Sequence, residues 1–197
     1  MKIAAVIFDL DGTITRPYLD FNQICAEIGD VQGPLLEAME IMTPADRQRA
    51  EDILHRHELD AAENSRLNPH VPELLQRLKD QKRRIGIVTR NRLDSVRRVC
   101  RMHNLVFDGI STREDGPAKP HPFAVLHVCA QLNVTPQRSL VVGDYLFDLQ
   151  SARRAGAKSI LYRSQQHSHG HEREADFVID DLNELTEIIT NLENNFL

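Results

Sequence analysis

Short, almost wholly apolar runs recur along the chain, and amphipathic helical patterns separate most of them. The runs lie at 3–8, 85–88, 107–110, 140–142, 159–162 and 177–179, and the third is the weakest. Near-continuous apolarity is typical of strands that are covered on both faces of a parallel sheet, whereas half-exposed strands alternate apolar and polar residues. We therefore predict that these runs are strands of a buried parallel sheet.

Between the runs, apolar residues recur at the spacing of three and four that marks one face of a helix. The helical stripes lie at 71–78, 93–100, 125–132, 149–155 and 182–189. Pro72 suits a first helical turn, and Gly156 would end the fourth of these helices. Strands that alternate with helices imply right-handed crossovers, so the predicted fold class is α/β, a doubly wound, Rossmann-like parallel sheet.

One interval breaks this alternation, because residues 16–69 contain helical patterns but no convincing strand. Stripes near 21–28, 35–39 and 50–57 predict amphipathic helices there. We therefore expect an α/β core domain of residues 1–15 and 70–197 and a small inserted helical cap domain of residues 16–69. The insertion begins just after the first strand, where a lid over the end of that strand would be anchored.

Composition narrows the function classes. A chain of 197 residues, 41% of them hydrophobic, can bury a sizeable core. Its formal charge of −5 and scattered basic residues do not favour a nucleic-acid partner. The run at 3–8 is too short for a signal-peptide core, and no apolar segment approaches the roughly 18 residues of a membrane span. We expect a cytoplasmic protein without a membrane partner; the oligomeric state stays open, with a monomer slightly favoured.

The three cysteines do not form a C-x-x-C pair, and each lies in an apolar helical stripe, so we interpret them as small buried side chains in a reducing compartment. They are Cys25, Cys100 and Cys129. The polar stretch 164–174 is interpreted as a solvated loop. Its alternating His167, His169 and His171 have no cysteine partner, so we favour solvated side chains over a metal site.

Acidic residues directly follow two of the predicted strands. Asp9 and Asp11 follow the first, and Asp144 and Asp148 follow the run at 140–142. A single such Asp is often a turn residue or a helix cap. Four at one edge of a sheet, where ligands of parallel sheets bind, would repel one another unless a cation intervened. Mg²⁺ prefers carboxylate, water and phosphate oxygens, so we predict a Mg²⁺ and phosphate site.

A hydroxyl and two cations are expected at the same edge. Thr89 and Arg90 follow the second strand, and Lys119 lies between the third strand and the next helix. In an extended chain the side chains of Asp9 and Asp11 would point the same way. One carboxylate could then contact the metal and attack phosphorus while the other handled the leaving-group proton. The spacing alone leaves open which of the two attacks.

These residues together resemble the haloacid dehalogenase superfamily, specifically its subfamily I phosphatase branch with a helical cap of the C1 type after the first motif. Relatives of this kind include phosphoglycolate phosphatase-like and beta-phosphoglucomutase-like enzymes. The resemblance covers about residues 3–180 and depends on four motifs in order. They are DLDGT at 9–13, Thr89 after an apolar strand, Lys119 before Pro120, and GDYLFD at 143–148.

The resemblance implies a role for each motif residue. Asp9 would be the nucleophile that forms an aspartyl-phosphate, and Asp11 would be the general acid and then the base for the hydrolytic water. Thr89 would hydrogen-bond the transferring phosphoryl group, and Lys119 would neutralise its charge and steady Asp9. The implied Mg²⁺ ligands are Asp9, Asp11 through its backbone carbonyl, Asp144 and, as a ligand or a partner of one, Asp148.

The sequence departs from many relatives after the second motif, where Arg90 stands between Thr89 and Asn91. Thr89, Arg90, Asn91 and Lys119 are the candidate substrate-binding residues. Arg90 could bind an anionic leaving group such as a carboxylate through two hydrogen bonds. We favour the alternative that it is a solvated charge at the end of a strand, and Arg16 has the same two interpretations.

Other branches of the superfamily fit less well. The halide-removing enzymes do not need an acid at the position of Asp11, and the phosphonate-cleaving enzymes use a cap lysine, whereas residues 13–77 contain no Lys. We therefore expect a Mg²⁺-dependent phosphatase that hydrolyses a small phosphorylated metabolite, such as phosphoglycolate or a sugar phosphate. A sugar phosphomutase is the alternative, and a non-catalytic phosphate-binding protein is a third, less favoured one.

Overall fold

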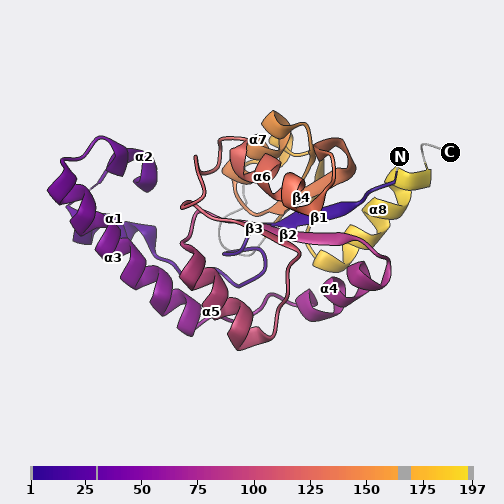
Figure 1. The fold of residues 1–197 in the computed structure, drawn as a ribbon, viewed down its shortest axis with the longest axis horizontal. Helices are drawn as coiled ribbons and strands as arrows, with labels where there is room; N and C mark the ends of the chain where they lie inside the picture. The colour runs from indigo at the N-terminus through magenta and orange to yellow at the C-terminus, as the bar shows by residue number, and fades with distance from the viewer. Residues whose placement is uncertain (1, 30, 164–169, 195–197) are drawn as a thin grey trace.

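The structure is a computed structural model that describes residues 2–29, 31–163 and 170–194. Its centre is one parallel sheet with the strand order β3-β2-β1-β4-β5-β6 (Figure 1). The strands are β1 (Ala5–Phe8), β2 (Arg84–Val88), β3 (Gly109–Ser111), β4 (Ser139–Gly143), β5 (Lys158–Tyr162) and β6 (Phe177–Ile179). Each strand overlaps one of the apolar runs, and the predicted doubly wound α/β fold is confirmed.

Strand β1 lies between β2 and β4, and this position determines where a ligand can bind. Phe8 pairs with Ile87 of β2 and with Val142 of β4. From β1 the chain builds the sheet outward through β2 and β3, and it then crosses to the other side of β1 to add β4. Such a reversal opens a crevice at the carboxyl ends of the two strands that flank it. The residues that follow β1 and β4 therefore meet at that crevice.

Helices cover both faces of the sheet (Figure 1). One face is covered by α6 (Phe123–Leu132) and α7 (Leu146–Ala155), and the other by α4 (Val71–Asp80), α5 (Leu93–His103) and α8 (Leu185–Asn194). Alternate residues of β1 supply the two cores: Ile7 packs toward Val128 of α6, whereas Val6 and Phe8 join the cluster that contains Leu74 of α4. The described residues also contain three short 3₁₀ turns: η1 (Pro136–Arg138), η2 (Glu172–Glu174) and η3 (Leu182–Glu184).

The segment predicted to form the cap contains α1 (Phe21–Ile28), α2 (Leu35–Glu40) and α3 (Pro44–Glu63), and we call residues 16–69 the proposed cap. These helices extend to one side of the sheet, and α3 packs along α5 (Figure 1). They have a hydrophobic cluster of their own, whose buried members are Ile24, Leu35, Met39, Ala50 and Leu54. An apolar cluster separate from the main core is what a small inserted layer of helices needs.

Asn68 joins the two connections between the core and the proposed cap. Its buried side-chain amide donates to the carbonyl oxygens of Gly12 (3.1 Å), Thr13 (2.8 Å) and Thr15 (3.0 Å). Its backbone N–H donates to the carbonyl of Ile14 at 3.0 Å. The loop that leaves β1 is therefore held against the segment that returns to the core.

Other sequence predictions have mixed outcomes. His167 and His169 lie outside the described residues, and the ring of His171 lies edge-on to that of Tyr145, with centroids 5.3 Å apart. Cys25, Cys100 and Cys129 form no disulfide with one another. Cys129 is buried, and the other two are half-buried. Within the described ranges, none of the helices combines the length and the apolar character needed to span a membrane.

Candidate active site

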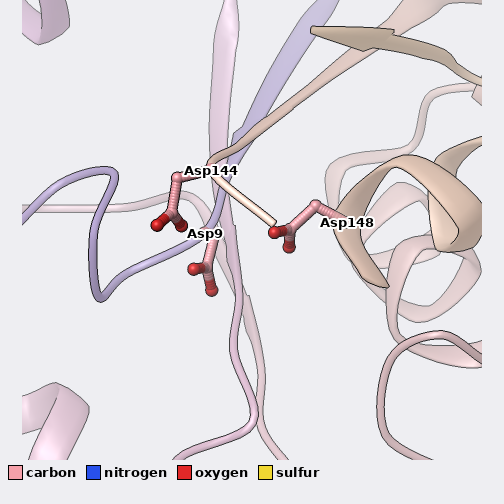
Figure 2. A group of neighbouring side chains, drawn as sticks. All are labelled: Asp9, Asp144 and Asp148. Atoms are coloured by element: carbon pink, nitrogen blue, oxygen red, sulfur yellow. The ribbon is translucent and has the colours of Figure 1, made fainter. Parts of the chain in front are cut away.

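Three carboxylates meet at the crevice between β1 and β4. Asp9 directly follows β1, Asp144 directly follows β4, and Asp148 lies in the first turn of α7 (Figure 2). One carboxylate oxygen from each lies within 4.8 Å of those of the other two. Asp144 and Asp148 are buried, and Asp9 is nearly so. The structure thus brings together three of the four aspartates that the sequence placed at this edge.

Two glycines allow this close approach. Gly12 has a φ of +85°, and a Cβ there would lie 2.2 Å from Oδ2 of Asp144. Gly143 ends β4, and a Cβ there would lie 2.2 Å from Cγ of Asp148. Both separations are far below van der Waals contact, and a positive φ also disfavours other residues at Gly12. The carboxylates can take these positions only because the two neighbouring residues have no side chain.

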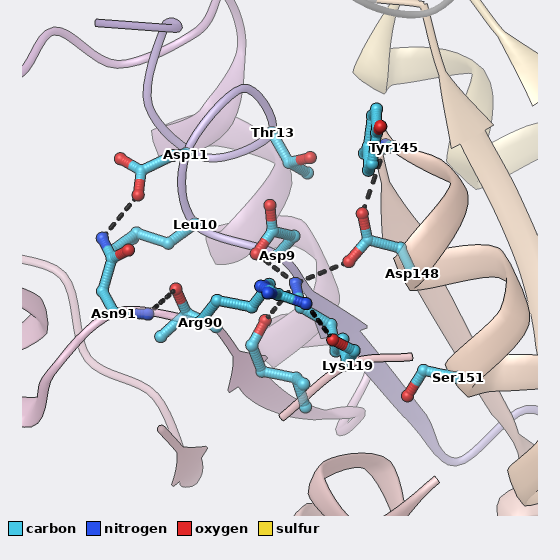
Figure 3. A network of polar contacts seen from close by, with 12 residues as sticks. Asp9, Leu10, Asp11, Thr13, Arg90, Asn91, Lys119, Tyr145, Asp148 and Ser151 are labelled. Atoms are coloured by element: carbon cyan, nitrogen blue, oxygen red, sulfur yellow. Dashed lines mark hydrogen bonds and ion pairs between the residues drawn. The ribbon is translucent and has the colours of Figure 1, made fainter. Parts of the chain in front are cut away.

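Lys119 is the cation of the cluster. Its Nζ donates to Oδ1 of Asp9 at 2.5 Å, to Oδ1 of Asp148 at 2.6 Å and to the carbonyl of Val88 at 3.0 Å (Figure 3). An ammonium group has three hydrogens to donate, so these contacts use its full capacity. Lys119 is 3% exposed, which is tolerable for a charge only because it is paired on two sides.

The charges of the cluster do not balance. Burial raises the pKa of Asp9 to about 7, Lys119 opposes the rise, and the charge of Asp148 adds to it. Burial, together with the charges of Asp9 and Asp148, raises the pKa of Asp144 well above its usual value. For Lys119 burial acts in the opposite direction, but the carboxylates of Asp148 and Asp9 outweigh it and raise the pKa. A further positive charge beside these oxygens would lower the energy of the ionised cluster, as a hard divalent cation would.

The side chain of Asp11 lies apart from those of Asp9 and Asp148 (Figure 3), and it is not part of the group of three carboxylates. Its Oδ2 accepts a hydrogen bond from the side-chain amide of Asn91, and its Oδ1 accepts one from Oγ1 of Thr15 at 3.3 Å. Burial raises the pKa of Asp11, and these two hydrogen bonds oppose the rise. The Asp11 carboxylate is therefore positioned separately from the cluster around Lys119, and a contact from its backbone carbonyl to a metal stays a prediction.

Thr89 and Asn91 form a short turn after β2. The hydroxyl of Thr89 is buried and accepts the backbone N–H of Asn91 at 3.1 Å. Because a hydroxyl both accepts and donates, its hydrogen can still be given to a phosphoryl oxygen. The same turn thus presents the Thr89 hydroxyl and holds the Asn91 amide on Asp11.

Arg90 is paired with the proposed cap. Its guanidinium makes a two-pronged ion pair with Glu37 of α2, with N–O distances of 2.6 and 2.9 Å. It also donates to the carbonyl of Lys119 and lies 4.8 Å from the centre of the Phe147 ring. The hydrogen bonds and charge of Arg90 overcome the effect of burial and hold the pKa of Glu37 below its usual range. From the sequence we interpreted Arg90 as a solvated charge or a substrate ligand, and neither interpretation included Glu37 as a partner. Arg16, which had the same two interpretations, is exposed.

Sequence reasoning missed several polar groups near the site. Asn68 has no sequence signal beyond the following proline, and Thr13, whose hydroxyl lies 3.4 Å from Oδ1 of Asp144, is hidden in the first motif. Glu58 is buried on α3, where it pairs with Arg113 from the loop after β3. A signal for Glu58 did exist, because it falls four residues after Leu54 on the apolar stripe of that helix.

Comparison with known proteins agrees with the family that the sequence motifs indicated. The family model for haloacid dehalogenase-like hydrolases matches residues 3–156, and the chain belongs to this family. The resemblance inferred from the four motifs is therefore confirmed, and the protein is a hydrolase. The matched segment includes all the candidate site residues.

Individual relatives cover nearly the whole chain. An uncharacterized hydrolase of Saccharomyces cerevisiae is 30% identical over 96% of this chain and 92% of its own length. An N-acetylmuramic acid 6-phosphate phosphatase of Pseudomonas aeruginosa is 26% identical over 96% of each chain. Among solved structures, a hydrolase from Pseudomonas syringae has a TM-score of 0.80 at 22% identity, covering 94% of this chain and 99% of that one. At that identity the likeness concerns the fold.

Proposed function

We propose that the protein is a Mg²⁺-dependent phosphatase that hydrolyses a small phosphorylated metabolite through an aspartyl-phosphate on Asp9. The observation that carries the proposal is the division of the carboxylates into two groups. Asp9, Asp144 and Asp148 share one lysine at the crevice, whereas Asp11 is held separately by Asn91 and Thr15. A metal-bound nucleophile and a general acid need this separation of environments.

The chemistry of the donors fits Mg²⁺. The ion prefers oxygen ligands and commonly binds one or two carboxylates together with waters and phosphate oxygens. Asp9, Asp144 and the Asp11 backbone carbonyl are the proposed ligands. Asp148 shares Lys119 with Asp9 and accepts the N–H of Tyr145 at 3.2 Å, so we propose that it acts mainly by orienting its neighbours. The bound ion would supply charge neutralisation for the phosphoryl oxygens.

The protein residues account for both half-reactions. A carboxylate oxygen of Asp9 attacks phosphorus, the bond to the leaving-group oxygen breaks, and Asp11 gives that oxygen its proton. Lys119 and the Thr89 hydroxyl bind the phosphoryl oxygens during the transfer. Asp11 then removes a proton from water, whose oxygen attacks the aspartyl-phosphate, and phosphate leaves as Asp9 is regenerated. Because burial raises the pKa of Asp11, this residue holds a proton more readily than an exposed aspartate would.

The substrate class is supported less directly. The relative from Pseudomonas aeruginosa is named as a phosphatase for a phosphorylated amino sugar, which agrees with a small phosphorylated metabolite as substrate. We propose a phosphoglycolate-like or sugar-phosphate substrate, and residues 16–69 as the cap that covers its leaving group. An acidic leaving group could use Arg90 only by displacing Glu37.

The test is a phosphate-release assay on a panel of phosphorylated metabolites and one aryl phosphate, with Mg²⁺ and with EDTA. The wild-type protein should release phosphate only with Mg²⁺, and Asp9→Asn should abolish release while the protein stays folded by circular dichroism. Full activity of Asp9→Asn with the aryl phosphate would refute the proposal. Isomerised substrate without free phosphate would instead identify a phosphomutase.

A further inference from the structure

We infer that Glu58, on α3 of the proposed cap, is a positioning residue for the general acid Asp11 and acts through Arg113 and the turn at residues 90–92. The inference rests on the proposed function, because it assigns Glu58 an influence on the acid of that reaction. Glu58 does not touch Asp11; its effect would pass through the hydrogen bonds of the turn.

Glu58 and Arg113 form a buried ion pair between the proposed cap and the core. The side chain of Glu58 is 1% exposed and that of Arg113 is 8% exposed, and Nη1 of Arg113 donates to Oε1 of Glu58. Burial raises the pKa of Glu58 to about 7 although Arg113 opposes the rise. A buried ion pair is a poor source of stability, since desolvation offsets much of its attraction. In some proteins a buried polar or ionic group instead holds nearby elements in one geometry.

The side chains of the pair and the backbone of Arg113 together hold the turn after β2 at three consecutive residues. Nη1 of Arg113 also donates to the carbonyl of Arg90 at 3.0 Å. The backbone N–H of Arg92 donates to Oε2 of Glu58 at 3.3 Å. The backbone N–H of Arg113 donates to the carbonyl of Asn91 at 3.3 Å. The backbone on both sides of Asn91 is thus tied to the ion pair.

Asn91 connects the turn at residues 90–92 to the general acid Asp11. Its side-chain amide donates to Oδ2 of Asp11, and its backbone N–H donates to the Thr89 hydroxyl. Displacement of the turn would therefore rotate the amide away from Asp11 and loosen the carboxylate that must point at the leaving-group oxygen. Small misplacements of a reacting group can cost large factors in rate. The cap would in this way influence proton transfer as well as cover the substrate.

A second ion pair between α3 and the core provides a control. Glu63 of α3 and Arg98 of α5 lie 2.7 Å apart, and their side chains are 51% and 45% exposed. This pair joins the proposed cap to the core just as the first one does, but neither side chain has a described hydrogen bond to the turn at 90–92. Glu63→Gln therefore removes a contact between α3 and α5 without disturbing the turn.

The experiment compares a phosphate ester with a poor alkyl leaving group and an aryl ester with a good one. Glu58→Gln keeps the shape of the side chain but removes its charge. One of the two carboxylate oxygens becomes an N–H₂ group, which cannot accept the hydrogen bond from Arg113 or from Arg92. We expect kcat/KM for the alkyl ester to fall about tenfold, which is a small part of the roughly 100- to 10,000-fold that a general acid contributes, with little change for the aryl ester. The ratio kcat/KM reports the steps up to phosphoryl transfer, whereas kcat also includes hydrolysis of the aspartyl-phosphate, in which Asp11 would act as the base for both esters. Glu63→Gln should leave both values unchanged.

Asn91→Ala tests the route. If Glu58 acts through Asn91, adding Glu58→Gln to Asn91→Ala should cause no further loss for the alkyl ester. The double variant Glu58→Gln/Arg113→Met leaves no unpaired charge, so it should recover thermal stability relative to Glu58→Gln while keeping the selective loss. This double variant keeps the inference testable if Glu58→Gln alone folds poorly.

Asp11→Asn distinguishes a failure of the proposed function from a failure of the inference about Glu58. If Asp11→Asn reduces kcat/KM of both esters equally, the acid role in the proposed function is wrong. If Asp11→Asn selectively harms the alkyl ester but Glu58→Gln harms both equally or neither, only the inference about Glu58 is wrong. Additive losses in Glu58→Gln and Asn91→Ala would also overturn it.

Discussion

Asp9→Asn should stabilise the metal-free protein in a way that depends on pH. Burial raises the pKa of Asp9 from 3.8 to about 7. Between these two values the folded protein holds a proton on Asp9 that the unfolded chain has released. The folded state thus binds more protons there, and the free energy of unfolding falls as pH rises through that window. Asparagine does not titrate, so the variant does not suffer this loss.

The size of the effect follows from the shift. A change of one pKa unit corresponds to about 1.4 kcal/mol, so the full shift is worth up to about 4 kcal/mol, of which about 3 kcal/mol falls between pH 5 and pH 8. Asp9 is 9% exposed, so solvent screening reduces this figure little. The measurement is urea unfolding of both proteins in EDTA at pH 5 and pH 8. The stability of Asp9→Asn minus that of wild type should grow by about that amount between the two pH values.

Magnesium supplies the control. At pH 8 the added ion should stabilise the wild-type protein more than Asp9→Asn, because binding to the folded state alone raises stability and the variant has lost a charged ligand. A difference between the two proteins that is the same at pH 5 and pH 8 would contradict the reasoning about burial. Equal stabilisation of both proteins by Mg²⁺ would show that Asp9 is not a ligand.

Three further predictions concern the surroundings of the site. Gly12→Ala should destabilise the fold by about 1–3 kcal/mol in thermal unfolding and abolish Mg²⁺-dependent turnover, because its Cβ would displace Asp144; wild-type activity would contradict this. Asn68→Ala should cost about 1–3 kcal/mol in urea unfolding, since it leaves buried carbonyls unpaired; a loss below about 0.5 kcal/mol would contradict the role of Asn68 in holding the loop that leaves β1. Glu37→Gln should change stability by less than about 1 kcal/mol and lower KM selectively for substrates with a carboxylate, because it frees Arg90; an unchanged KM would argue against Arg90 as a substrate ligand.

Much of the architecture could be read from local patterns. The apolar runs predict the strands because a strand covered on both faces must be apolar throughout, and the helical stripes between them imply parallel crossovers. The carboxyl ends of parallel strands share one edge of the sheet, so the sequence also indicated that the charges would meet there. The strand order seen in the structure then places Asp9 and Asp144 side by side. The run at 107–110 was the weakest, and β3 is correspondingly short, Gly109–Ser111, at the edge of the sheet.

The partners of individual charges could not be predicted in the same way. Arg90 and Glu37 are far apart in the chain, as are Glu58 and Arg113, and nothing local in either residue of a pair specifies the other. Glu58 could have been noticed on the apolar stripe of α3, but its partner is determined by how that helix packs against the core.

The sequence by itself therefore determined the class of fold, the edge of the sheet that holds the site and the types of residue that gather there, because hydrophobic periodicity is a property of the chain and the carboxyl ends of parallel strands share one edge. Only the tertiary structure decided that Lys119 joins Asp9 to Asp148, that Asn91 holds Asp11 away from them, and that the proposed cap reaches the same turn through Glu58. The physical reason is that electrostatic and hydrogen-bond energies depend on distances between groups remote in sequence, and packing sets those distances.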